Sequence, residues 1–337
     1  RMESGDYKGC TVIDLNDVKG LPDEFKGMKE TIKVLIRSDG TPTYIAKDIA
    51  FHMWKFGIIS NTFRFGTFIE KQPNGKPILE TASEGKEMGL ANADMSINII
   101  DVRQSYPQAV LKLAFKGIGR DDVADGIRHL AYGEVELETG ALSGRKGTWI
   151  GFSADDLLAE ARERSSKLIK AKFNFSDEEQ NRISASVALA AIKFEFMRIS
   201  PEKKIVFSWD RALNFEGNSG PYVQYMYARA SRILEQAGKA DKAVKTDQLN
   251  TQEFALLKLL SKGHEIMEKA AREQRPNVIT EYASELASGF SKFYEASPVL
   301  KAESGELKSL RLSITASVRE TLGEMLSLLG IEPLERM

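Results

Sequence analysis

The chain has 337 residues, of which 42% are hydrophobic and 28% charged, and its formal net charge is −1. This length is sufficient for two or three domains with buried cores, and the composition is that of an ordinary globular protein. The near-neutral charge gives no global sign of a nucleic-acid partner, so any such binding must depend on local basic patches.

The single cysteine, Cys10, excludes an internal disulfide and a cysteine-based zinc site. A reducing, cytoplasmic compartment is the simplest interpretation. No apolar run approaches the ~20 residues that cross a bilayer, and no signal peptide is recognisable. We therefore expect a cytoplasmic protein with no membrane partner.

The first half of the chain alternates predicted strands and helices. Residues 1–30 are rich in Gly, Asp and Lys, which is typical of a connector or the remnant of a missing region. Beyond them we expect strands at 31–37, 97–102 and 132–138, helices at 44–56 and 107–116, and a hairpin of 63–69 with 77–82. Such alternation predicts a mostly parallel sheet, with ligands beyond the carboxyl ends of its strands.

Nearly everything after Ser153 is predicted to be helical. Apolar residues recur at helical spacing in six segments: 154–171, 177–197, 221–237, 251–273, 278–296 and 306–329. The predicted fold class is therefore α/β followed by all-α, with the join near residues 200–210.

Tyr44 and Asp48 are four residues apart on the helix predicted at 44–56, so they share one face. A carboxylate beside a phenol can bind a planar cation such as guanidinium through paired, charge-assisted hydrogen bonds. The alternative is an ordinary exposed aspartate that pairs with Lys47. The residues alone leave both interpretations of Asp48 open.

A glycine-rich loop follows the strand predicted at 132–138. Its residues Ser143, Gly144, Arg145, Lys146 and Gly147 place two cations between glycines, which suits closure over an anion. The spacing of a Walker loop is absent. A basic surface turn is the alternative.

The helix predicted at 221–237 begins after the backbone breakers Asn218, Ser219 and Gly220. Four of its residues fall on one stripe: Tyr222, Tyr225, Arg229 and Arg232. Phenols and guanidiniums in this pattern suit an RNA backbone and its unstacked bases. The alternative is that the two tyrosines belong to the core and the two arginines are solvated, because such an arrangement has the same spacing.

These stretches also carry a resemblance. The run WDRALNFEGNSGPYVQYMYARASRIL resembles the entry to the anticodon-binding domain of the arginyl-tRNA synthetases, a class I family. The run SDGTPTYIAKDIAFH is similar to the motif with which that family holds its substrate arginine. The match covers most of residues 31–337. It implies that Tyr44 and Asp48 bind arginine, with Gln104 in the same pocket.

The loop at 142–147 resembles the second class I signature, usually Lys-Met-Ser-Lys-Ser, although Ala141 replaces the first lysine and Leu142 the methionine. The resemblance implies that Ser143, Gly144, Arg145, Lys146 and Gly147 bind ATP. Lys146, assisted by Arg145, would stabilise charge on the departing pyrophosphate. Mg²⁺ would accompany ATP as part of the substrate. No metal site of the protein itself and no tightly bound cofactor are expected.

Class I synthetases also need a His-x-Gly-His motif, whereas His52, His129 and His264 stand isolated here. The chain also begins at Arg1, without an initiator methionine. We therefore expect the C-terminal portion of a longer enzyme, and we expect this portion alone to be inactive. The closing run LLGIEPLERM resembles the natural C-terminus of the family.

The resemblance as a whole implies an arginine–tRNA ligase that activates L-arginine with ATP and transfers it to tRNA(Arg). Its expected parts are the second half of a Rossmann-like nucleotide fold at 31–150, a helical junction at 151–205 and an α-helical anticodon-binding bundle at 206–337. The resemblance places the contacts of Tyr222, Tyr225 and Arg229 with tRNA on a stripe that Arg232 shares, and we expect a monomer. A non-catalytic tRNA-binding module and a nucleotide-binding α/β protein with an unrelated helical cap are the alternatives.

Overall fold

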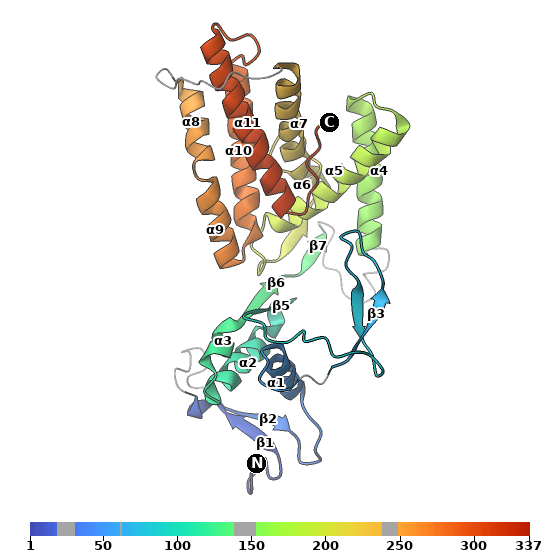
Figure 1. Ribbon diagram of the computed structural model, residues 1–337, viewed down its shortest axis with the longest axis vertical. Coiled ribbons are helices and arrows are strands. Elements are labelled where there is room, and N and C mark those ends of the chain that lie inside the picture. The colour runs from blue at the N-terminus through green and yellow to red at the C-terminus, as the bar shows by residue number, and fades with distance from the viewer. Residues whose placement is uncertain (19–30, 61–62, 138–152, 238–248) are drawn as a thin grey trace. The chain divides into compact units, whose positions relative to one another are not determined.

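The computed structural model describes residues 1–18, 31–60, 63–137, 153–237 and 249–337 (Figure 1). The chain forms two compact units, Arg1–Tyr132 and Gly133–Met337. The first unit mixes short strand pairs with helices, and the second is almost entirely helical (Figure 1). The α/β-then-helical fold class predicted from the sequence is confirmed.

The first unit contains three separate strand pairs in its described residues. The strands β1 (Thr11–Asp14) and β2 (Ile32–Ile36) are antiparallel, as are β3 (Phe65–Ile69) and β4 (Ile78–Thr81). The strands β5 (Ser96–Asp101) and β6 (Ile127–Tyr132) are parallel. They are joined through a short 3₁₀ turn and the helices α2 (Ser105–Gly117) and α3 (Asp121–Gly126).

These pairings show where the expectation of a mostly parallel sheet was too broad. Parallel pairing needs a long crossover connection, which α2 and α3 supply between β5 and β6. The strands β3 and β4 are joined by a tight turn at Asn74-Gly75 and pair antiparallel, as the predicted hairpin requires. Among the described residues, parallel pairing is therefore confined to two-stranded pairs.

Helix α1 (Tyr44–Lys55) agrees with the prediction because its boundary signals are local. The Thr43 side chain accepts a hydrogen bond from the Ala46 N–H at 3.4 Å, which satisfies an amide that the first turn leaves unpaired. After the helix, Gly57 has φ +67°, a left-handed conformation that favours glycine.

The strand expected at 132–138 is divided. It comprises the end of β6 and the separate strand β7 (Val135–Leu137), which pairs in parallel with β8 (Ile205–Phe207). Gly133 lies between them against the backbone of Lys203, where a Cβ atom would come within 2.6 Å of the Lys203 carbonyl carbon. This close approach explains the glycine.

The second unit is built from helices. Their bounds are α4 (Ala154–Lys172), α5 (Asp177–Met197), α6 (Trp209–Ala212), α7 (Gly220–Ala237), α8 (Thr251–Leu260), α9 (Gly263–Glu273), α10 (Pro276–Ala296) and α11 (Gly305–Leu328). The core of this unit is packed with fully buried side chains such as Val223, Phe290, Phe293, Val318 and Met325. Their spacing on each helix follows the helical period.

The single helix expected at 251–273 is two helices, because α8 ends at Leu260 and α9 begins at Gly263. The Tyr282 hydroxyl of α10 donates a hydrogen bond to the Leu259 carbonyl at 3.0 Å. The same carbonyl also accepts a hydrogen bond from the Lys262 N–H at 3.1 Å, so it has two donors at the turn between the two helices. Burial raises the pKa of Tyr282 to about 12, so the hydroxyl keeps its proton and remains a donor.

Candidate functional site

Tyr44 and Asp48 lie one turn apart at the start of α1, and both reach the surface. The Tyr44 ring is 88% exposed, and the Lys47 ammonium lies 5.9 Å from its centroid. Asp48 is partly exposed, and within the described part of the chain no salt bridge occupies its carboxylate. The alternative of an Asp48–Lys47 ion pair is therefore not observed, and the carboxylate remains available to an external cation.

Gln104 closes the 3₁₀ turn Val102–Gln104, between the carboxyl end of β5 and the start of α2, and is exposed. The turn is fixed by Asp101, whose carboxylate accepts hydrogen bonds from Arg103 Nε and Nη2 at 2.9 Å each. These bonds lower the pKa of Asp101 to about 2. Gln104 therefore follows a strand end, as expected, but neither pocket described below includes it together with Tyr44 and Asp48.

A buried hydrogen-bond network connects α1 to β5 and α2. His52 Nδ1 donates to the Asp48 carbonyl at 2.8 Å, and His52 Nε2 accepts from the Asn98 amide at 3.0 Å. The same amide donates to Gln108 Oε1 at 2.7 Å. Because a carbonyl oxygen can only accept, these contacts assign the proton of neutral His52 to Nδ1. Burial lowers the pKa of His52.

The glycine-rich loop lies outside the described residues. The expected ATP contacts of Ser143, Gly144, Arg145, Lys146 and Gly147 are therefore predictions from the sequence. His129 lies in β6 and donates from Nε2 to the Ile100 carbonyl at 3.1 Å. Among the described residues, no group of three His, Cys, Asp or Glu side chains could hold a metal ion.

In the second unit, the turn before α7 has the breaks that the sequence predicted. Asn218 has φ +49°, and its side chain accepts a hydrogen bond from the Ser284 hydroxyl at 3.0 Å. Ser219 Oγ accepts from the Tyr222 N–H at 3.1 Å and so caps the helix. Gly220 lies directly against α5, where a Cβ atom would approach the Ala190 backbone.

The four residues of the predicted α7 stripe have different surroundings. Tyr222 is 5% exposed and belongs to the hydrophobic core, so its ring does not face solvent. This position does not fit the expected stacking on a base, because the ring packs within the bundle. Tyr225 and Arg229 are partly exposed and Arg232 is exposed.

A pocket of about 770 Å³ brings together the exposed part of this stripe and residues from distant segments. The Arg229 guanidinium lies 4.8 Å from the ring centroid of Tyr225 and 5.1 Å from that of Tyr294 on α10. Arg229 Nη2 also donates to the Tyr225 hydroxyl at 2.8 Å. The pocket thus presents a cation between two aromatic rings. Its other lining residues include Phe173, Phe175, Arg232, Leu300, Arg336 and Met337.

The C-terminal segment forms one wall of this pocket because hydrogen bonds hold it against α5 and α7. Gln224 Nε2 donates to the Glu332 carbonyl at 2.8 Å, and Arg182 pairs with the Glu332 carboxylate at 2.8 Å. Arg336 pairs with Glu235 of α7 at 3.4 Å. Leu334 of this segment is buried and packs in one cluster with Ile169 and Ile183.

Sequence reasoning missed several residues of the pocket. Phe173 and Phe175 flank Asn174 between two helices, and their rings stack with centroids 5.8 Å apart. An aromatic pair in a short connection is a signal that could have been noticed. Tyr294 carries no such signal, because only the packing of α10 brings it beside Arg229.

No described helix is long and apolar enough to span a membrane.

Comparison with known proteins gives two family matches. Residues 80–209 match the catalytic domain of class I tRNA synthetases (R), and residues 223–337 match the DALR anticodon binding domain. The second match includes the pocket residues of α7, α10 and the C-terminal segment.

Similar proteins match over almost the whole of this chain. The arginine–tRNA ligase of Pyrococcus abyssi is 42% identical over 341 residues, which is 99% of this chain and 52% of that protein. That of Thermus thermophilus is 39% identical over 100% of this chain and 56% of its own length. A solved Thermus thermophilus arginyl-tRNA synthetase superposes with a TM-score of 0.89 at 37% identity, covering 100% of this chain and 55% of that one. The chain spans about half the length of the curated relatives it matches.

Proposed function

The chain belongs to the arginyl-tRNA synthetase family, and from this we propose that it contributes to the ATP-dependent joining of L-arginine to tRNA(Arg). In the first step, an arginine carboxylate oxygen attacks the α-phosphorus of ATP, which forms arginyl-adenylate and releases pyrophosphate. In the second, a ribose hydroxyl of tRNA attacks the arginyl carbonyl and releases AMP. Neither step needs a covalent protein intermediate, so catalysis depends on positioning and electrostatic stabilisation.

We propose that the arginine guanidinium pairs with Asp48, with Tyr44 and Gln104 completing the site. The unpaired, partly exposed carboxylate of Asp48 supports this role. His52 binds the Asp48 carbonyl and so holds this turn of α1 in place. Specificity follows from the charge, because a ligand without a matching cation would leave the carboxylate desolvated and unpaired.

We propose that MgATP is the second substrate and that Lys146 and Arg145 stabilise the pyrophosphate as its charge develops. The match of residues 80–209 to a class I catalytic domain supports this assignment. A cation near the departing pyrophosphate lowers the barrier because its attraction for the phosphate oxygens increases as negative charge builds up on them in the transition state.

We propose that the pocket of α7 and α10 binds an unpaired segment of tRNA. The observation that carries this proposal is the Arg229 guanidinium, which lies between the rings of Tyr225 and Tyr294 in a domain that matches an anticodon-binding model. A base can stack on either ring, and Arg229, Arg232 and Arg336 can neutralise phosphates. Tyr222 is not included, because it is buried.

Filter binding of transcribed tRNA(Arg) tests this assignment. We expect Arg229→Gln to weaken binding by about tenfold, within the range of one lost stacking and charge contact. Arg272→Gln is the matched control, since Arg272 is exposed on α9 and does not line the pocket. Equal affinities of the two variants would remove the pocket from the tRNA interface.

A further inference from the structure

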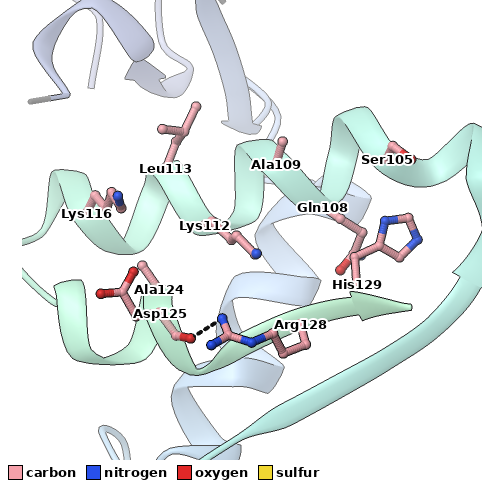
Figure 2. A pocket seen from close by; sticks show the side chains of 10 residues that line it. All are labelled: Ser105, Gln108, Ala109, Lys112, Leu113, Lys116, Ala124, Asp125, Arg128 and His129. Atoms are coloured by element: carbon pink, nitrogen blue, oxygen red, sulfur yellow. Dashed lines mark hydrogen bonds between the residues drawn. The ribbon is translucent and has the colours of Figure 1, made fainter. Parts of the chain in front are cut away.

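A second pocket, of about 350 Å³, lies in the first unit, and the proposed function does not use it. Figure 2 shows it between α2 on one side and α3 with β6 on the other. None of the proposed arginine-binding residues Tyr44, Asp48 and Gln104 lines it.

Three cationic side chains converge on this pocket. Lys112 and Lys116 are four residues apart and therefore lie on one face of α2. Arg128 approaches from β6, and its Nη1 donates a hydrogen bond to the Asp125 carbonyl, which fixes the guanidinium at the pocket wall (Figure 2). Asp125 is the acidic residue of the lining, so the pocket carries an excess of positive charge.

The positive groups repel one another. Lys112 is half-buried, and its pKa is lowered chiefly by burial and next by the charge of Arg128; Asp125 opposes this shift, and Lys116 adds the smallest lowering effect. A bound anion would relieve this repulsion, because each like-charge pair would gain an intervening negative charge.

Gln108 adds a neutral donor to the same pocket. Its side chain is 4% exposed, and Figure 2 shows it between α2 and β6, beside His129. Gln108 Oε1 accepts the 2.7 Å hydrogen bond from Asn98, which leaves the amide N–H₂ as the free end of the side chain. Among the described residues, no hydrogen bond uses this N–H₂ group.

We propose that this pocket is a binding site for a phosphate group, which Lys112, Lys116 and Arg128 neutralise and to which Gln108 donates a hydrogen bond. A single carboxylate would balance one of the three cations. A phosphate carries more charge and several acceptor oxygens, so it matches three cations and an amide donor better. Two sources of the group are compatible with an open pocket: the backbone of an RNA strand, or a free anion such as pyrophosphate.

Calorimetric titration of the complete chain with pyrophosphate tests the site. We expect Lys112→Met and Arg128→Gln each to weaken binding by about tenfold. Lys76→Met is the matched control, because Lys76 lies exposed in the hairpin turn, and it should change the affinity by less than about twofold. Arg128 is exposed, so Arg128→Gln is expected to fold even if Lys112→Met does not, and circular dichroism of each variant checks this.

Lys146→Ala distinguishes this pocket from the proposed ATP loop. If pyrophosphate binds the pocket, Lys146→Ala retains the binding that Lys112→Met loses. If Lys146→Ala instead loses pyrophosphate binding and Lys112→Met retains it, the pocket proposal is overturned and the proposed ATP loop is supported. The two proposals therefore fail on different results.

An unstructured RNA of about twelve nucleotides, close to the length that single-strand-binding folds cover, identifies the source. RNA that displaces pyrophosphate assigns the pocket to the RNA backbone, and RNA that leaves pyrophosphate bound assigns it to a free anion. The proposal is overturned if neither pyrophosphate affinity nor RNA affinity responds to Lys112→Met and Arg128→Gln.

Discussion

At the scale of single residues, Asp48 has the clearest chemical role in the proposed reaction. Its carboxylate is partly exposed, and its own carbonyl is bound by His52 one turn later. The side chain can therefore meet a ligand while its backbone is held by the buried network. This combination of a fixed backbone and an available charge is what selective binding of a cation requires.

We expect Asp48→Asn in the complete enzyme to raise the KM for arginine by at least about tenfold, because a neutral amide cannot balance the charge of the arginine guanidinium. Arginine-dependent pyrophosphate exchange measures this. Asp121→Asn, an exposed change at the start of α3, serves as the control. An unchanged KM in Asp48→Asn would exclude Asp48 from the arginine site.

His52 makes the stability of the first unit depend on pH. Its pKa is lowered from 6.5, chiefly by burial and also by the charge of Lys55, although the Asp48 carbonyl, Asn98 and the Asp48 carboxylate oppose the shift. The folded unit therefore binds a proton less readily than the unfolded chain. The stabilising contribution is complete above about pH 6.5 and is lost progressively as the pH falls towards the lowered pKa.

We expect urea unfolding of the first unit to show a free energy of unfolding that decreases below about pH 6.5. His52→Gln should remove that part of the pH dependence, whereas His264→Gln, at an exposed position of α9, should retain it. A pH profile that is the same in both variants would show that His52 does not stay neutral in the folded unit.

At the scale of elements, the start of α7 depends on a glycine for steric reasons. A Cβ atom at Gly220 would lie 2.7 Å from the Ala190 carbonyl carbon and 3.0 Å from Phe194 Cβ. Both neighbours belong to α5, and a backbone atom cannot move aside as the end of a flexible side chain can. The close packing of α5 and α7 therefore requires glycine at this position.

We expect Gly220→Ala to lower the free energy of unfolding of the helical unit by about 1–3 kcal/mol, the usual cost of overpacking. Gly217→Ala is an internal control, because a Cβ atom there would meet nothing within 4 Å. Thermal unfolding of the two variants measures the difference. Equal melting temperatures of the two variants would show that α5 and α7 can move apart to fit the Cβ atom with little loss of stability.

The elements predicted from the sequence are correct where their signals are local. Thr43 and Ser153 cap α1 and α4 through their own side chains, which accept hydrogen bonds from nearby backbone amides. The division of the segment 251–273 is different, because the Tyr282 hydroxyl that meets the Leu259 carbonyl comes from another helix. No pattern within the segment could have indicated that contact.

At the scale of the whole molecule, a net charge of −1 conceals local basic surfaces. The pocket of α7 and α10 includes Arg229, Arg232 and Arg336, together with Glu235 and Glu335. RNA binding there would depend on these few arginines rather than on the overall charge, and few counterions would be released.

We therefore expect a moderate salt dependence of tRNA binding. Three phosphate contacts on a single strand predict a slope of log K against log salt of about −2. Filter binding between about 50 and 200 mM salt measures this slope, which Arg232→Gln should reduce by roughly 0.7. A slope near zero would contradict phosphate contacts in this pocket.

The sequence by itself determined most of the longer helices and strands, the helical second half of the chain, and the resemblance on which the proposed function depends. These properties are encoded locally, in spacing, in capping side chains and in short motifs that act within a few residues.

Only the tertiary structure decided that Tyr222 is buried while Tyr225 meets Arg229 and Tyr294, and that Lys112 and Arg128 share a pocket. The side of a helix that faces the core, and the distant residue that completes a site, are fixed by packing between segments far apart in the chain.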